Sequence, residues 1–232
     1  MHRLLMPLLA PWLILQGKRV HRSTLRLPEA EGEKQGSCGT GTDLNLLIVG
    51  DSAAAGVGCK TQDDALAGQL AGLLSKHHQV NWQLVAQSSR TCAGVLDMVR
   101  NTKLSLSSVD AVVISVGVND VTKRTSYRQW QRDLNELTGY LRDTLGGAQI
   151  IYTGLPPMHH FPALPQPLRW FIGQQARQLD KLLARHCLTN AKVHYLKLDL
   201  PFSAKYMARD GFHPNPTAAK IWAQRAADII RS

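Results

Sequence analysis

Three side chains in this sequence are of the types needed for nucleophilic attack on a carbonyl group. Ser52 follows directly after the apolar segment 44–49, and a serine hydroxyl needs a base before it becomes a strong nucleophile at neutral pH. His213 can take that proton near pH 7. Asp210 lies three residues before the histidine, where its carboxylate can orient the imidazole and stabilise the imidazolium. These residues predict a Ser–His–Asp triad, provided that the fold brings them together.

Attack on a carbonyl also requires hydrogen-bond donors for the oxyanion that develops in the transition state. The backbone N–H of Ser52 is one candidate. The side-chain amide of Asn119, in the segment 117–120 (GVND), is a second. Asparagine also forms turns by bonding to its own backbone, so the residues alone leave both interpretations of Asn119 open.

Strand-like and helix-like segments alternate from about residue 44 onward. The expected strands are short apolar runs, as in strands buried on both faces, and the expected helices carry apolar residues at helical spacing. Strands are predicted at 44–49, 81–86, 110–117, 148–154 and 193–198, and helices at 64–77, 93–103, 126–145, 167–186 and 216–230. This alternation predicts a parallel sheet between two layers of helices, a three-layer α/β/α fold.

The candidate catalytic segments all follow predicted strands. Segments 50–52, 117–120 and 154–157 come directly after strands, and 210–213 lies between the last strand and the last helix. Ligand sites in such sheets lie at the carboxyl ends of the strands. We therefore expect these four loops to meet at one edge of the sheet.

Three of these segments resemble motif blocks of the SGNH (GDSL-type) hydrolase family. They are GDSAAAG (50–56), GVND (117–120) and DGFHPN (210–215), in the family's order and spacing. The resemblance covers about residues 44–230. It implies a flavodoxin-like sheet of about five parallel strands, hydrolysis of carboxylic esters through an acyl-enzyme, and no cofactor. It also implies a triad of Ser52, Asp210 and His213, and an oxyanion hole drawn from Ser52, a glycine of a further block and Asn119.

The block with that glycine departs from the family pattern. After the second strand the family has a glycine in a stretch like S-G-x-T, whereas this chain has Ser88-Ser89-Arg90-Thr91. Only a backbone N–H is needed, so Ser89 can serve if its backbone adopts the required geometry. Gly94 is a competing alignment, but a helix should already have begun there. We prefer Ser89.

The segment 154–170 (GLPPMHHFPALPQPLRW) contains five prolines. Because proline stiffens a loop at little entropic cost, this loop could form a substrate pocket with Met158, Phe161 and Trp170. The alternative is a packed connection without substrate contact.

Other chemistries are less well supported by the residues. Asp51 and Asp120 could form a glycosidase-type carboxylate pair, but each is better interpreted as a hydrogen-bond acceptor that braces a catalytic loop. His159 and His160 have no acidic partner at ligand spacing, and none of the four cysteines forms a CxxC pair. The sequence therefore predicts no metal site.

The formal net charge of +10 is spread along the chain. We interpret it mainly as a solvated surface, with weak attraction to anionic lipid or an acidic substrate left open. No nucleic-acid partner is predicted, because no basic stripe interleaved with aromatic residues is present.

Residues 1–43 are predicted to lie outside the hydrolase domain, 44–232. They hold an apolar run at 4–15 and a polar linker at 28–43. The run is shorter than the roughly 20 residues that span a bilayer, no signal cleavage site follows it, and Pro7 and Pro11 argue against one straight helix. Two interpretations remain: a segment that packs on the domain or covers its site, and peripheral membrane contact through residues 4–26. The positive charge after the run favours a cytoplasmic or membrane-associated location over secretion.

The expected function is that of a serine esterase acting on a small or lipid-like ester. An acyltransferase on the same scaffold, or a non-catalytic ligand-binding domain, are the alternatives. The complete set of Ser52, Asp210, His213 and Asn119 argues against the last of these.

Overall fold

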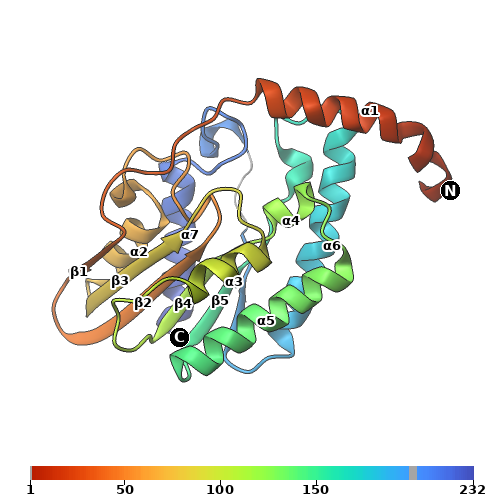
Figure 1. The fold of residues 1–232 in the computed structure, drawn as a ribbon. Coiled ribbons are helices and arrows are strands. Elements are labelled where there is room, and N and C mark those ends of the chain that lie inside the picture. The colour runs from red at the N-terminus through yellow and green to blue at the C-terminus, as the bar shows by residue number, and fades with distance from the viewer. Residues whose placement is uncertain (1, 199–202) are drawn as a thin grey trace.

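A six-stranded sheet forms the centre of the computed structural model, which describes residues 2–198 and 203–232 (Figure 1). The strands are β1 (Gln35–Cys38), β2 (Thr42–Gly50), β3 (His78–Ala86), β4 (Ala111–Ser115), β5 (Gln149–Thr153) and β6 (Val193–Leu196). Their order in the sheet is β1-β3-β2-β4-β5-β6. β2 to β6 are parallel, and β1 pairs antiparallel with β3 at the edge. The predicted parallel sheet of five strands is confirmed, with an added antiparallel strand.

Helices cover both faces of this sheet (Figure 1). They are α1 (His2–Ser23), α2 (Leu66–Leu74), α3 (Cys92–Arg100), α4 (Val118–Thr122), α5 (Tyr127–Leu145), α6 (Leu168–Leu188) and α7 (Pro216–Ile230), with 3₁₀ turns at Gln62–Asp64, Met158–His160 and Ala204–Tyr206. α2 and α7 pack on one face, and α3, α5 and α6 pack on the other. The three-layer fold is therefore as predicted.

β2 lies between β3 and β4 and has a core on each side. Leu47 and Val49 belong to the apolar cluster beneath α3, α5 and α6, whereas Leu46 and Ile48 belong to the cluster beneath α2 and α7. Successive strand residues point to opposite faces, so an unbroken apolar run suits a strand that is covered on both. This burial holds β2 in the middle of the sheet, and the candidate nucleophile Ser52 lies just after its end.

The polar segment 28–43 was expected to be a linker. This expectation was wrong for its residues 35–38, which belong to the sheet. Residues 35–38 form β1, Glu31 bridges to Thr61, and Ala30 is buried. The sequence QGSC carries little apolar surface because β1 lies at an edge, where three of its four residues are exposed. Backbone pairing rather than a hydrophobic pattern therefore holds it.

The apolar N-terminal run forms part of α1, which continues through Pro7 and Pro11. The two prolines therefore do not divide this segment into separate helices. Leu13 is buried against the domain, and Gln16 donates to the carbonyl of Gln166 at 2.7 Å and accepts from the N–H of Leu168 at 3.1 Å. α1 thus packs on the loop that precedes α6. In the described part of the chain, no helix is both long and apolar enough to cross a bilayer.

Candidate active site

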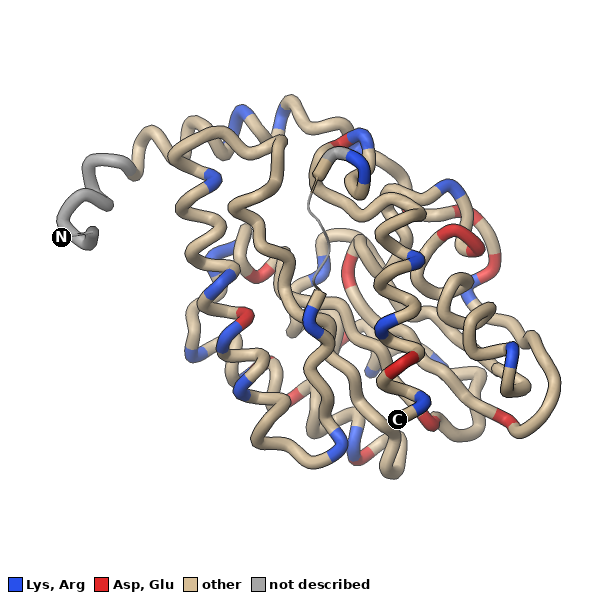
Figure 2. Tube along the Cα trace, turned by 180° about the vertical axis from the view of Figure 1, so that it is seen from behind, with Lys and Arg blue, Asp and Glu red and all other residues tan. Residues whose placement is uncertain are grey.

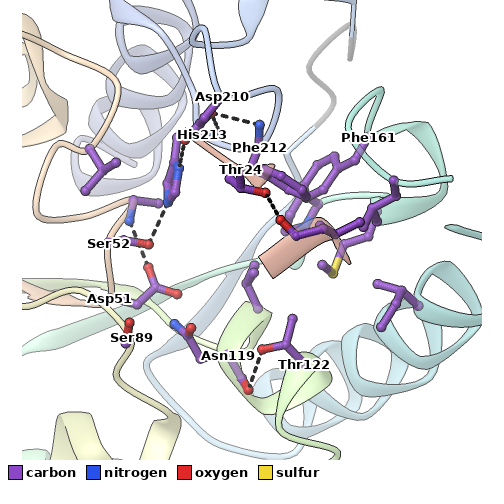
Figure 3. Close-up of a pocket in the computed structure, with 18 of the residues that line it drawn as sticks. Thr24, Asp51, Ser52, Ser89, Asn119, Thr122, Phe161, Asp210, Phe212 and His213 are labelled. Atoms are coloured by element: carbon purple, nitrogen blue, oxygen red, sulfur yellow. Dashed lines mark hydrogen bonds and ion pairs between the residues drawn. The ribbon is translucent and has the colours of Figure 1, made fainter. Parts of the chain in front are cut away.

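The predicted triad residues lie in a continuous hydrogen-bonded chain at the carboxyl end of the sheet (Figure 3). Nε2 of His213 is 2.8 Å from Oγ of Ser52. Nδ1 of the same imidazole is 2.6 Å from Oδ2 of Asp210. These three side chains, up to 161 residues apart in sequence, therefore have the spacing required for proton transfer from a hydroxyl to a histidine.

Close packing at the end of β2 sets the position of Ser52. A Cβ atom on Gly50 would lie 2.5 Å from the carbonyl oxygen of Ser115, so only glycine fits there. The buried carboxylate of Asp51 accepts hydrogen bonds from the N–H of Ala53 and from Oγ of Ser115, both at 3.1 Å. The turn that presents Ser52 is thereby tied to the neighbouring strand β4.

The motif 210–215 combines the base with the start of α7. Oδ1 of Asp210 accepts from the N–H groups of Phe212 and His213 at 2.9 and 3.1 Å. Asn215 then caps α7 by accepting from the N–H of Ala218, as asparagine commonly does at this position. The hydrogen bonds of Asp210 and the cap of α7 therefore position the turn that carries the imidazole.

Asp210 is 7% exposed, yet its carboxyl group favours the charged form. Burial by itself raises its pKa. The hydrogen bonds from His213 and Phe212 and the charge of His213 outweigh that effect, so the pKa lies below its ordinary value. Asp210 is therefore ionised at neutral pH and can stabilise an imidazolium.

Ser89 has the backbone conformation of the glycine that it replaces. Its φ of 66° lies in the left-handed region, which glycine adopts without steric cost and other residues rarely adopt. Among the described residues, none accepts a hydrogen bond from the N–H of Ser89. Gly94, the competing candidate, lies in the first turn of α3 and donates its N–H to Oγ1 of Thr91. The geometry thus favours Ser89 as the backbone donor.

Asn119 lies at the start of α4 and lines the same cavity as Ser52 and Ser89 (Figure 3). Its Nδ2 donates to the carbonyl of Arg90 at 3.0 Å. An amide group carries two N–H donors, so one remains for a ligand. The bond to Arg90 fixes the orientation of this amide.

Two residues that the sequence analysis missed hold the loop around Ser89. Oε1 of Glu29 accepts from the N–H of Ser88 at 2.7 Å, and Nζ of Lys123 donates to the carbonyl of Ser89 at 3.0 Å. Burial raises the pKa of Glu29, but its hydrogen bonds to Ser88 and Lys34 outweigh this and lower the pKa. Neither residue belongs to a motif, so only the tertiary structure identifies them.

The triad opens into a cavity of about 870 Å³. Of the pocket residues predicted from the sequence, Met158 and Phe161 line this cavity and are almost completely buried. Trp170 lies on α6, is 41% exposed and is not among the lining residues. The prediction of Trp170 as a pocket residue is therefore not supported by the geometry.

α1 and the residues after it supply one wall of the cavity. The sequence left this open, with packing on the domain or its site and peripheral membrane contact as the two interpretations of the segment. The lining residues of this wall include both apolar and basic side chains: Leu13, Ile14, Gly17, Lys18, Val20, His21, Thr24, Leu25, Arg26 and Leu27. Figure 3 labels Thr24 among the side chains that line this cavity together with His213.

Asp51 and Asp120 brace two loops of the site rather than face one another as a catalytic pair. Asp120 accepts from the N–H of Cys92 and the hydroxyl of Thr125. Burial raises the pKa of each of the two carboxyl groups to about 6. Within the described residues, no cluster of three or more histidine, cysteine or acidic side chains could hold a metal ion.

Residues 48–221 match the model of the GDSL-like Lipase/Acylhydrolase family. The chain belongs to this family. The resemblance predicted from the three motif blocks is confirmed. A GDSL-like esterase of Mycobacterium tuberculosis is 29% identical over 131 residues. That match covers 55% of this chain and only 40% of the relative, so the chain spans less than half of the relative's length.

Two solved structures illustrate how widely the family fold recurs. The psychrotrophic esterase EstA from Pseudoalteromonas sp. is 20% identical, with a TM-score of 0.58, and the match covers 81% of this chain and 96% of EstA. A family 3 carbohydrate esterase from Clostridium thermocellum is 18% identical, with a TM-score of 0.64, and the match covers 82% and 98%. At these identities the likeness shows the fold.

Proposed function

We propose that the protein is a serine ester hydrolase with Ser52 as nucleophile, His213 as base and Asp210 as the residue that orients the base. The observation that carries this proposal is the hydrogen-bonded chain from Ser52 through His213 to Asp210, which opens onto an apolar cavity. Membership of the lipase and acylhydrolase family and the esterase relative support it.

In the proposed reaction, His213 removes the proton of Ser52 as Oγ attacks the ester carbonyl. The negative charge on the carbonyl oxygen is stabilised by the N–H groups of Ser52 and Ser89 and by the amide of Asn119. The imidazolium then protonates the leaving alcohol, and an acyl group remains on Ser52. Attack by water, activated by the same histidine, releases the acid and restores the serine.

The cavity favours an ester with an apolar acyl or alcohol group. Met158, Phe161 and Leu168 are buried apolar residues of its wall, and contact with them removes apolar substrate surface from water. The basic side chains of Lys18, Arg26 and Arg124 also line it. Lipid-like esters with a polar or anionic group therefore fit the lining better than small, uniformly polar esters.

The test is hydrolysis of p-nitrophenyl esters of increasing acyl length by the wild type and by Ser52→Ala. We expect the variant to lose at least about 10⁴-fold in kcat, because the nucleophile is missing, and to lose labelling by a fluorophosphonate. Ser107→Ala is the matched control, since Ser107 is exposed and remote from the site. Activity of Ser52→Ala close to that of the control would remove Ser52 from the mechanism.

Transfer to an alcohol instead of water would use the same nucleophile and base. Adding short alcohols to the assay separates the two reactions, because a transferase would form the new ester in preference to the free acid.

A further inference from the structure

The exposed apolar side chains of this protein are concentrated near its N-terminus. In the described structure, large apolar side chains are exposed at seven positions, and four of these lie within residues 12–25. They are Trp12, Ile14, Leu15 and Leu25, with Trp12 54% and Leu15 59% exposed. Single exposed apolar residues are ordinary, but a cluster of them on one segment indicates an interaction surface.

α1 has two faces with different neighbours. Leu13, Gln16 and Val20 face the domain, where Leu13 is buried and Gln16 bonds to the loop before α6. Trp12, Leu15, Arg19 and Arg22 follow one another at intervals of three and four residues and are all exposed, so they share one face of the helix, turned away from the cavity-lining residues Gly17 and His21. We call these four residues the outer face of α1. It is apolar toward the N-terminus and basic toward the C-terminus.

The charge of this segment is of one sign. Residues 1–28 contain five lysine and arginine residues and no aspartate or glutamate. In the described part of the chain, Arg19 and Arg22 form no salt bridge. Figure 2 shows basic residues along α1 without acidic residues between them. Positive charge without internal partners beside exposed tryptophan and leucine is the composition of helices that lie in the interface of anionic membranes.

We propose that the outer face of α1 docks the protein on an anionic lipid bilayer. Trp12 and Leu15 would enter the boundary between headgroups and acyl chains, where tryptophan is enriched, and Arg19 and Arg22 would contact lipid phosphates. A second copy of the chain would bring an equally positive face against this one, which disfavours a dimer through the same surface. A nucleic acid would leave Leu15 and Trp12 without an apolar environment.

Docking in this orientation places α1 between the lipid surface and the cavity. α1 presents its outer face to solvent while residues on its other side line the cavity. Membrane docking goes beyond the proposed esterase activity and is measured without turnover, so failure of either proposal leaves the other intact.

The experiment is flotation of the full chain with vesicles of phosphatidylcholine alone and of equal parts phosphatidylcholine and phosphatidylglycerol. We expect binding to the anionic vesicles and weak binding to the neutral ones. The double variant Arg19→Glu/Arg22→Glu should bind the anionic vesicles at least about tenfold more weakly, because each basic residue near the surface contributes to the attraction. Trp12→Ser/Leu15→Ser should also bind the anionic vesicles more weakly than the wild type. This difference should persist at a salt concentration that screens charge, because it comes from apolar contact.

The matched control is Lys181→Glu/Arg185→Glu, which makes the same change of charge on exposed residues of α6. It should bind like the wild type. Equal losses in both charge-reversal variants would mean that the net charge alone drives binding and would overturn the proposal. Unchanged binding in the outer-face variants would overturn it as well. The proposal would also be overturned if light scattering showed that the wild type is a dimer and that Trp12→Ser/Leu15→Ser is a monomer.

Discussion

The two halves of the candidate site are held in different ways. In the triad half, Ser52, His213 and Asp210 contact one another directly through side chains. In the proposed oxyanion half, the candidate donor is the backbone N–H of Ser89, whose loop is held by hydrogen bonds with Glu29 and Lys123. The difference suggests that a change in the first half removes a chemical group, whereas a change in the second misplaces one. Losses of rate should be much larger in the first.

The largest effect among the orienting residues is expected for Asp210→Asn. An asparagine can hold the wrong tautomer of His213 and cannot stabilise the imidazolium, so kcat should fall by about 10⁴-fold. The measurement is kcat for an activated ester, with circular dichroism to check folding. Asp228→Asn, at an exposed position of α7, is the control. A loss of less than tenfold in Asp210→Asn would mean that the carboxylate does not orient the base.

Asn119→Ala should have a smaller but clear effect. Loss of one oxyanion donor usually lowers kcat by about 10²- to 10³-fold, with little change in KM because the interaction forms mainly in the transition state. Steady-state kinetics on one ester measures both constants. If kcat is unchanged, the amide serves only to hold the carbonyl of Arg90 and the turn interpretation of Asn119 is correct.

Glu29→Ala tests whether the loop around Ser89 needs its tether. Loss of the carboxylate frees the N–H of Ser88, and we expect kcat to fall by about tenfold through misplacement of the neighbouring donor. Glu29→Gln keeps an acceptor oxygen and should recover most of that rate. Lys34→Ala removes only the exposed ion pair with Glu29, which contributes little. Equal rates for the alanine and glutamine variants would assign Glu29 no positioning role.

Ser89→Gly should have the smallest effect on rate. Glycine accepts the φ of 66° without strain but loses more entropy on folding, so the free energy of unfolding should rise by no more than about 1 kcal/mol. The N–H is retained, and kcat should stay within about twofold of the wild type. Denaturant unfolding and ester hydrolysis measure the two. The control is Ser88→Gly, which should lower the free energy of unfolding because φ is not positive there. A large loss of kcat in Ser89→Gly would show that the serine side chain itself contributes to the rate.

The sequence predicted the sheet and the triad because both have local signals. Apolar runs such as 44–49 mark strands buried on two faces, and the motifs 50–56 and 210–215 stand at strand and helix ends. The backbone N–H of Ser89 was predicted only conditionally, since no residue pattern reveals a positive φ at a serine.

The parts that were missed depend on contacts between segments far apart in the chain. β1 carries no apolar alternation because it is an exposed edge strand, and Glu29 reaches its loop across 59 residues. Trp170 was predicted to line the pocket from its place in the segment 154–170, but the burial of a side chain depends on which way its helix faces. Only packing decides this.

Because α1 forms one wall of the cavity, substrate selection depends on a different part of the chain from the reaction itself. The α/β domain carries the proposed reacting groups, while one wall of the cavity comes from a helix held to the domain by Leu13 and Gln16. Acyl-length preference could therefore diverge between homologous enzymes through changes in their leading segments alone, with the chemistry of bond cleavage untouched.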